Sequence, residues 1–272
     1  CDRRIVPAVE DPRFADLPVR IAATAKVDPE SILEPHEVRR MDRSQQLALI
    51  AAREAWADAG KPEVEQARLG VAVGSGVGGA ISLMEQYDVL RDRGASRVSP
   101  MTVPMLMPNG PAAVIGLELG AMAGVHTPVS ACASGAEAIG YGAEMIRTGR
   151  ADVVICGGTE GCIHPLTIAA FAAMRALSTL HENAAGASRP FDRDRDGFVL
   201  GDGAGVVMLE VGLSATCATI GWPEEIPPRM PPALLLRKPS GVSSSRCSVP
   251  RWDTQAKPAP ISTPFTALML IS

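Results

Sequence analysis

Two short apolar runs, each followed directly by glycines, most constrain what this chain can fold into. Residues 69–73 (LGVAV) lead into a glycine loop at 74–79 (GSGVGG), and residues 152–156 (DVVIC) lead into a Gly-Gly pair. Runs of this length and composition are typical of buried strands. A helix-period segment at 80–93 follows the first loop. Because strands that alternate with helices form βαβ units, the pattern predicts an α/β fold with the glycine-rich loops at one edge of the sheet.

Helical spacing elsewhere agrees with this fold class. Between Asp42 and Ala59 apolar residues recur every three or four positions, and Asp42 is a favoured N-cap residue. Gly60 and Pro62 end the pattern. Three further elements are expected: a helix starting near Pro111, a helix over 168–177 and a strand over 206–210.

The composition is that of a globular protein, with 46% hydrophobic and 21% charged residues among 272. The net charge of −4 gives no reason to expect nucleic-acid binding, which requires a basic stripe. No basic region followed by an apolar run opens the sequence, so no signal peptide is expected. Prolines interrupt the uncharged tract at 98–117, so a soluble protein without a membrane span is expected. The six cysteines are scattered without a disulfide spacing, which favours a reducing, cytoplasmic location.

The stretch that most restricts function is VSACASG, residues 129–135. A β-prone run from near Val125 meets Cys132, and a helix-period segment of small residues follows over 135–147. The free N–H groups of a helix's first turn favour a thiolate and an oxyanion formed beside it. A sharp strand-to-helix turn also lifts a nucleophile clear of the backbone. Cys132 is therefore a nucleophile or a small buried core residue, and spacing alone favours neither.

The glycine loop contains Gly74-x-Gly76-x-x-Gly79 between a strand and a helix, which resembles a dinucleotide-binding motif. That motif requires a second strand ending in an acidic residue about 20 positions further on, and a proline-rich loop stands there instead. The motif is therefore interpreted as a turn through which the backbone approaches another segment closely.

Two patterns resemble metal sites and fail on spacing. Residues 192–197 (DRDRDG) look like the start of a calcium loop, but the required glutamate position holds Gly203. Cys156, Cys162 and His164 lack the paired spacing of a zinc site. No metal and no cofactor are expected, and 192–197 is interpreted as a charged turn.

Five motifs stand in a fixed order along the chain: GSGVGG (74–79), VSACASGAEAIG (129–140), DVVICGGTEG (152–161), FAAMRALS (171–178) and ASRPFDRDRDGFVLGDGAGVVMLE (187–210). With these motifs, residues 14–210 resemble the β-ketoacyl-acyl-carrier-protein synthases, closest to synthase II of type II fatty-acid synthesis. The resemblance implies a thiolase-like αβαβα sandwich of two similar halves in a homodimer. This chain would hold the N-terminal half over residues 1–211.

The resemblance also implies a reaction. Cys132 would accept an acyl chain from acyl carrier protein as a thioester, with its own N–H as an oxyanion donor. Decarboxylation of malonyl-acyl carrier protein would then supply the attacking carbanion for a Claisen condensation. Val77 and Phe171 match positions that line the family's acyl channel, and Thr102 matches one that reaches toward the partner subunit's channel.

The chain departs from the family in three respects. Two catalytic histidines are expected in His-Gly-Thr and Gly-His motifs, but the four histidines, at 36, 126, 164 and 181, stand in neither. The family's opening strand is missing, and residues 212–272 form a Pro-, Ser- and Arg-rich tail that is expected to be disordered or out of frame. The chain is therefore expected not to condense, and to expose a sheet face that makes it poorly soluble.

Three alternative functions remain open. A polyketide ketosynthase uses the same nucleophile motif. A non-catalytic ketosynthase-like partner subunit would explain the missing histidines. An NAD-dependent oxidoreductase is the remaining candidate, on the glycine loop alone.

Overall fold

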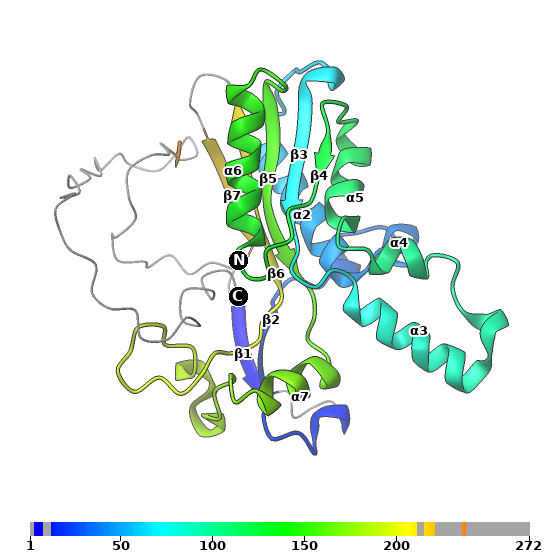
Figure 1. Ribbon diagram of the computed structural model, residues 1–272, viewed down its shortest axis with the longest axis vertical. Coiled ribbons are helices and arrows are strands. Elements are labelled where there is room, and N and C mark those ends of the chain that lie inside the picture. The colour runs from blue at the N-terminus through cyan, green and yellow to red at the C-terminus, as the bar shows by residue number, and fades with distance from the viewer. Residues whose placement is uncertain (1–2, 8–11, 211–214, 221–235, 238–272) are drawn as a thin grey trace.

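The computed structural model describes residues 3–7, 12–210, 215–220 and 236–237. Six strands form its main sheet in the order β4-β3-β5-β6-β7-β8 (Figure 1). β3 lies parallel to both β4 and β5, β6 lies antiparallel to β5 and β7, and β8 runs parallel to β7. The strands are β3 (Leu69–Gly74), β4 (Val125–His126), β5 (Val153–Glu160), β6 (Gly203–Glu210), β7 (Ala215–Ile220) and β8 (Leu236–Arg237).

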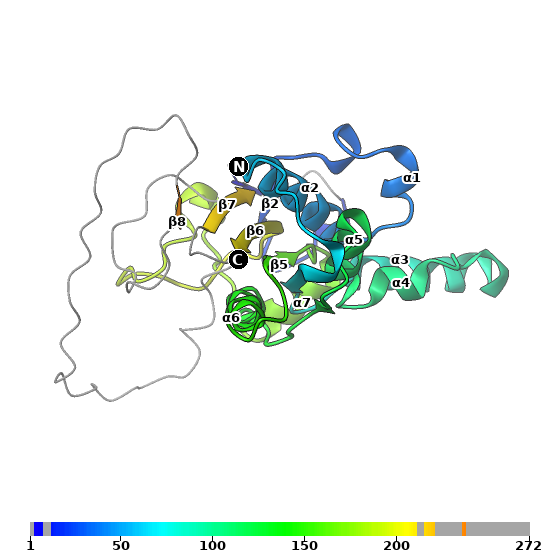
Figure 2. The ribbon, with the colours of Figure 1, turned by 90° about the horizontal axis from the view of Figure 1, so that it is seen from above.

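Helices cover both faces of this sheet (Figure 2). On one face, α2 (Arg43–Asp58) and α5 (Gly110–Leu119) pack against Val71, Ile155 and Met208. On the other face, α6 (Ser134–Arg147) packs against alternate residues of the same strands, such as Ala72 and Val154. Because successive side chains of a strand point to opposite faces, each apolar strand serves both layers, which explains its continuous apolar sequence.

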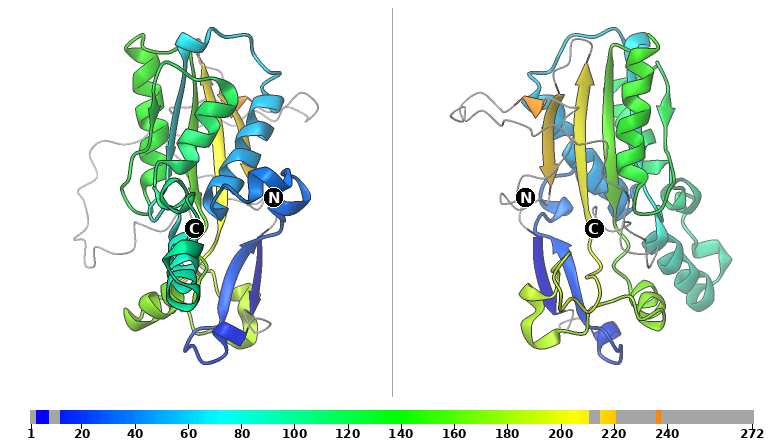
Figure 3. Two further views of the ribbon diagram at one scale, coloured as in Figure 1. Left: turned by 90° about the vertical axis from the view of Figure 1, so that its right-hand side faces the viewer. Right: turned by 60° about the vertical axis from the view of Figure 1, so that its left-hand side comes forward.

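The strands β1 (Arg3–Pro7) and β2 (Ile21–Ala25) and the helix α7 (Pro165–Ala173) lie beyond one end of the main sheet (Figure 3). β1 and β2 form a separate antiparallel pair. A third apolar cluster joins β2 to α7 through Ile21, Ile168 and Leu200. The other helices are α1 (Pro35–Val38), α3 (Ala80–Arg93) and α4 (Thr102–Leu106), with 3-10 turns at Pro12–Phe14, Pro29–Ser31, Gln66–Arg68, Ala95–Arg97 and His181–Gly186.

The expected α/β class is confirmed, and the boundaries of three elements differ from the sequence prediction. β5 continues through its glycines to Glu160, and β6 begins at Gly203, because the two strands stay paired in register from Gly157↔Val206 to Glu160↔Gly203. The helix predicted over 168–177 lies at Pro165–Ala173 instead. It ends there because Arg175 takes a left-handed backbone conformation with φ of 55°.

Predictions for the two ends of the chain are tested only in part. Of the tail over 212–272, the described residues are the strands β7 and β8, and the rest of the expected disordered tail lies outside the described residues. The segment Arg3–Pro7 is a strand, but among the described residues it pairs with β2 and not with the main sheet. Within the described part of the chain, no helix is both long and apolar enough to cross a membrane.

Candidate active site

Cys132 lies in a tight loop, here called the cysteine loop (residues 129–133), directly before α6. Ala131 adopts a left-handed conformation with φ of 53°, which costs roughly 1 kcal/mol or more for a residue with a Cβ. Ser134 holds this turn, because its Oγ donates to the Ala131 carbonyl at 2.6 Å and accepts from the Ser130 N–H at 2.9 Å. Cys132 itself is exposed. The alternative of a buried core cysteine is therefore wrong.

The start of α6 leaves hydrogen-bond donors available beside the thiol. Ala133 is the N-cap residue and supplies no side-chain cap. Among the described residues no acceptor is found for the Cys132 N–H. Free N–H groups at a helix N-terminus favour negative charge nearby, so the site can stabilise a thiolate or an oxyanion.

Glycines set how close α6 lies to the sheet. A Cβ on Gly74 of β3 would lie 2.5 Å from the Ser134 carbonyl oxygen, and a Cβ on Gly158 of β5 would lie 2.8 Å from the Gly135 Cα. Real Cβ atoms do not come this close to backbone. The small residues of the motif therefore let the helix start directly over β3 and β5, which fixes the cysteine loop at their ends.

The glycine loop (residues 74–79) packs against the cysteine loop. A Cβ on Gly76 would lie 3.1 Å from the Ala131 carbonyl oxygen and 3.2 Å from Oε2 of Glu160. The interpretation of the motif as a close-approach turn is confirmed. Val77, the predicted channel residue of this loop, is 43% exposed.

The other two described cysteines are unsuited to nucleophilic chemistry. Cys156 and Cys162 are buried. Burial raises the pKa of the Cys156 thiol and raises the pKa of Cys162 to about 12. Since the thiolate is the nucleophile, these thiols stay inert at neutral pH. The described residues contain no cluster of side chains that could hold a metal ion.

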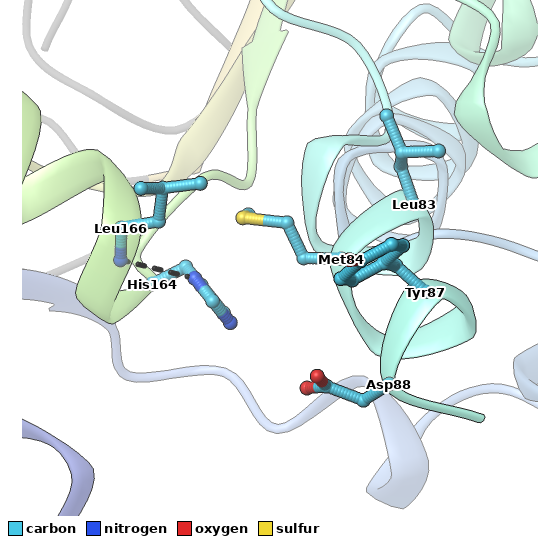
Figure 4. Close-up of a pocket in the computed structure, with 6 residues that line it drawn as sticks. All are labelled: Leu83, Met84, Tyr87, Asp88, His164 and Leu166. Atoms are coloured by element: carbon cyan, nitrogen blue, oxygen red, sulfur yellow. Dashed lines mark hydrogen bonds between the residues drawn. The ribbon is translucent and has the colours of Figure 1, made fainter. Parts of the chain in front are cut away.

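A cavity of about 420 Å³ opens between α3 and the start of α7 (Figure 4). Leu83, Met84 and Tyr87 line it from α3, and Leu166 lines it from α7. Two polar side chains complete it, Asp88 and His164. The sequence pattern does not indicate this cavity, because apolar residues at helical spacing predict a core. The signal is structural: Tyr87 is 62% exposed and Leu83 50% exposed on α3.

The predicted site residues fall into two groups. Val77 and Cys132 lie on loops that contact each other through Gly76. Phe171 is part of α7, where its ring packs edge-on against Phe198 at 5.3 Å, and Thr102 is the first residue of α4. For Phe171 and Thr102 the described contacts include none to the cysteine loop. His164, considered above as a zinc ligand, accepts the Leu166 N–H and thereby caps α7.

Comparison with known proteins identifies the family. The domain described as "Beta-ketoacyl synthase, N-terminal domain" matches residues 15–215. The chain is 50% identical over 196 residues to 3-oxoacyl-[acyl-carrier-protein] synthase 2 of Mycobacterium tuberculosis (strain H37Rv), covering 72% of this chain and 47% of the relative. It is 42% identical over 185 residues to the synthase 2 of Synechocystis sp., covering 67% and 44%.

Solved structures agree. A beta-ketoacyl synthase from Burkholderia phymatum superposes with a TM-score of 0.65 at 31% identity, covering 76% of this chain and 51% of that one. The ishigamide ketosynthase/chain length factor superposes with a TM-score of 0.65 at 27% identity, covering 76% of this chain and 50% of that one. The chain spans about half the length of the curated relatives it matches. The predicted resemblance is thereby confirmed, and the chain belongs to the beta-ketoacyl synthase family, whose N-terminal domain it contains.

Proposed function

We propose that Cys132 accepts an acyl chain from acyl carrier protein as a thioester, the first step of β-ketoacyl synthesis in fatty-acid elongation. The observation that carries the proposal is the placement of an exposed thiol directly before the uncapped N-terminus of α6. The name of the Mycobacterium tuberculosis relative supports the choice of substrate, since that protein is a 3-oxoacyl-[acyl-carrier-protein] synthase.

In this reaction the Cys132 thiolate attacks the carbonyl carbon of the acyl thioester. A new carbon–sulfur bond forms, and the negative charge passes to the carbonyl oxygen, where the Cys132 N–H donates to it. Collapse of this intermediate breaks the bond to the carrier's sulfur, which leaves as a thiol after taking up a proton. The products are acylated Cys132 and free carrier protein.

The acyl chain needs an apolar path away from Cys132, and we propose that Val77 and the α3–α7 cavity provide it. The glycine loop that carries Val77 continues directly into α3, whose Leu83 and Met84 line the cavity. Phe171 is part of α7, the helix that lines the cavity on the side opposite α3. A mostly hydrocarbon lining fits an alkyl chain and gives polar substrates little to bind.

We further propose that condensation itself requires groups that this chain does not supply. His126 packs on Tyr141 and lies 3.2 Å from an Arg150 nitrogen, His181 accepts the Arg20 N–H, and His164 caps α7. His36, the fourth histidine, is in α1. These placements give His126, His164 and His181 structural contacts, and decarboxylation of malonyl-acyl carrier protein is left without an assigned catalyst.

A homodimer is proposed on the family resemblance and on an exposed sheet edge. β4 is one edge strand of the main sheet among the described residues, and its Val125 is 40% exposed. Val129, in the cysteine loop that follows, is 55% exposed. Thr102 would approach the partner subunit's acyl path. The molar mass in solution, measured by light scattering, tests this assembly.

Intact-mass measurement after incubation with acyl-acyl carrier protein tests the proposed function. The chain is expected to gain the mass of one acyl group at Cys132, the Cys132→Ala variant none, and the buried-cysteine variant Cys156→Ala one group. Addition of malonyl-acyl carrier protein is expected to give no 3-oxoacyl product. A chain that gains no acyl group contradicts the proposal and favours a non-catalytic partner subunit.

A polyketide ketosynthase is the second candidate. It is favoured by the likeness to the ishigamide ketosynthase/chain length factor, although the identity is lower than to the fatty-acid relatives. Faster acylation from a polyketide carrier protein than from a fatty-acid carrier protein would favour this candidate.

A further inference from the structure

The last residue of β5, Glu160, collects the hydrogen bonds of the glycine loop. Its Oε1 accepts from the hydroxyl of Ser75 and, at 3.4 Å, from the N–H of Val77. The N–H of Gly76 is a further donor to this carboxylate. Ser75 Oγ in turn accepts the Gly78 N–H at 2.9 Å, which closes the loop on itself. One side chain from β5 therefore holds a loop that belongs to β3.

The surroundings of Glu160 make this an unusual place for a carboxyl group. Ser75 is buried, and Asp42 is close enough to disfavour a second negative charge. Burial, opposed by the bonds from Ser75 and the loop N–H groups, raises the pKa of Glu160 above its usual range. An apolar residue here would leave the loop's donors unsatisfied in a partly buried place, which explains why an acceptor is required.

The bonded loop reaches the nucleophile through Gly76. The position of a Gly76 Cβ is 3.2 Å from Glu160 Oε2 and 3.1 Å from the Ala131 carbonyl oxygen, so one backbone segment lies between the carboxyl group and the cysteine loop. Ala131 is the residue in the strained left-handed conformation, next to Cys132. The strain persists only while neighbouring groups hold the turn, and the glycine loop is one of those neighbours.

We propose that Glu160 is a positioning residue that fixes the glycine loop and, through Gly76, holds the cysteine loop in the geometry that Cys132 needs for acylation. The inference rests on the proposed acylation of Cys132, and it adds a residue to which neither sequence spacing nor the motifs had given a role. Glu160 acts through hydrogen-bond acceptance, so a glutamine, which keeps one acceptor oxygen, should preserve the effect and an alanine should not.

Hydrogen exchange followed by mass spectrometry tests the positioning directly on the full chain. In Glu160→Ala, amides of the glycine loop and of the cysteine loop are expected to exchange about tenfold faster, the effect of one or two lost hydrogen bonds, while those of α2 stay unchanged. Glu160→Gln is expected to stay within roughly threefold of the parent. The matched control is Glu144→Gln, an exposed glutamate on α6 that pairs with Arg147.

Two rates at Cys132 complete the test. Acylation by acyl-acyl carrier protein is expected to fall about tenfold in Glu160→Ala and to recover in Glu160→Gln, whereas alkylation by iodoacetamide, a small reagent, is expected to change little. If the parent chain is not acylated, the proposed function fails, and hydrogen exchange alone still decides the role of Glu160.

Three results overturn the proposal. Unchanged exchange of the cysteine loop in Glu160→Ala shows that the contact does not position it. If Glu160→Gln accelerates amide exchange of the two loops as much as Glu160→Ala does, the charge of Glu160, and not its hydrogen-bond acceptance, holds the loops. If Glu160→Ala does not fold, Ser75→Ala is used in its place, because this variant removes the main donor to Glu160 Oε1. In Ser75→Ala, faster exchange of the cysteine loop supports the proposal, and unchanged exchange overturns it.

Discussion

Two glycines on α6 allow the packing of this helix to be tested with the same substitution at two positions. Gly140 is open, since a Cβ there would meet nothing within 4 Å. Gly142 faces the sheet, and a Cβ there would overlap Cys156 Sγ and lie 3.2 Å from Val154 Cγ1. Both positions are inside the helix Ser134–Arg147. Alanine is therefore expected to stabilise the protein at 140 and to destabilise it at 142.

The expected magnitude follows from what the two variants share. Replacing glycine by alanine inside a helix contributes about 1 kcal/mol of stability, partly through the unfolded chain, and this gain is common to both. Gly142→Ala also overpacks the layer between α6 and β5, which costs about 1–3 kcal/mol. The difference in free energy of unfolding between the two variants isolates this cost, so Gly140→Ala should exceed Gly142→Ala by about 1–3 kcal/mol.

Urea unfolding followed by circular dichroism measures both values. Cys156→Ala should restore part of the stability of Gly142→Ala, because it removes the overlapped sulfur, although alone it costs about 1 kcal/mol as a small cavity. A double-mutant cycle is expected to give a favourable coupling of about 1–2 kcal/mol. Equal stabilities of Gly140→Ala and Gly142→Ala, or strict additivity in the cycle, would refute the close packing of α6 on β5.

Three other outcomes are expected. Iodoacetamide at about pH 8 should modify Cys132 on the order of 100-fold faster than Cys162, whose raised pKa leaves little thiolate, as peptide mapping will show. Asp42→Ala should destabilise the protein by about 2–4 kcal/mol in urea unfolding, because the buried carboxylate accepts four hydrogen bonds from two serines at the starts of α2 and α3. The hydrogen bond from Arg53 lowers the pKa of Glu37. The parent should therefore have a higher free energy of unfolding than Glu37→Gln at neutral pH, and this difference should disappear as the pH falls through the lowered pKa. A difference that grows in acid would contradict this.

The sequence predicted elements whose signals are local. The helix from Asp42 follows from its N-cap and apolar spacing, and the structure shows Asp42 accepting the Ser44 N–H as the cap. The strand at 69–73 follows from an apolar run between turn residues. Such signals do not depend on the rest of the chain, so one sequence is enough to read them.

Boundaries set by distant partners were not predictable in the same way. Gly157 and Gly158 have the composition of a turn, yet pairing with β6, some fifty residues away, keeps them in β5. The start of α7 had a signal that was overlooked: Pro165 is favoured at the first helical position, and His164 with Thr167 forms a capping box. Histidine is not among the usual N-cap residues, which explains the error.

The candidate site likewise has some features with a local sequence signal and others that depend on residues distant in sequence. The position of Cys132 directly before a helix was predictable, because the thiol, its small neighbours and the helix start are adjacent in sequence. The contact of Glu160 with Ser75 joins residues 85 positions apart, and the cavity between α3 and α7 depends on how two separate helices lie. Neither has a local pattern, so only the folded chain brings them together.

Glycines and polar side chains position Cys132 in different ways. Because Gly74 and Gly158 have no side chains, the first turn of α6 packs directly on the ends of β3 and β5. This close packing sets the distance of Cys132 from the sheet. Ser134 then fixes the turn at Ala131 from the helix side, and Glu160 holds the glycine loop behind it. Because packing sets the distance and hydrogen bonds set the conformation, losing either one is expected to misplace the thiol while most of the domain stays folded.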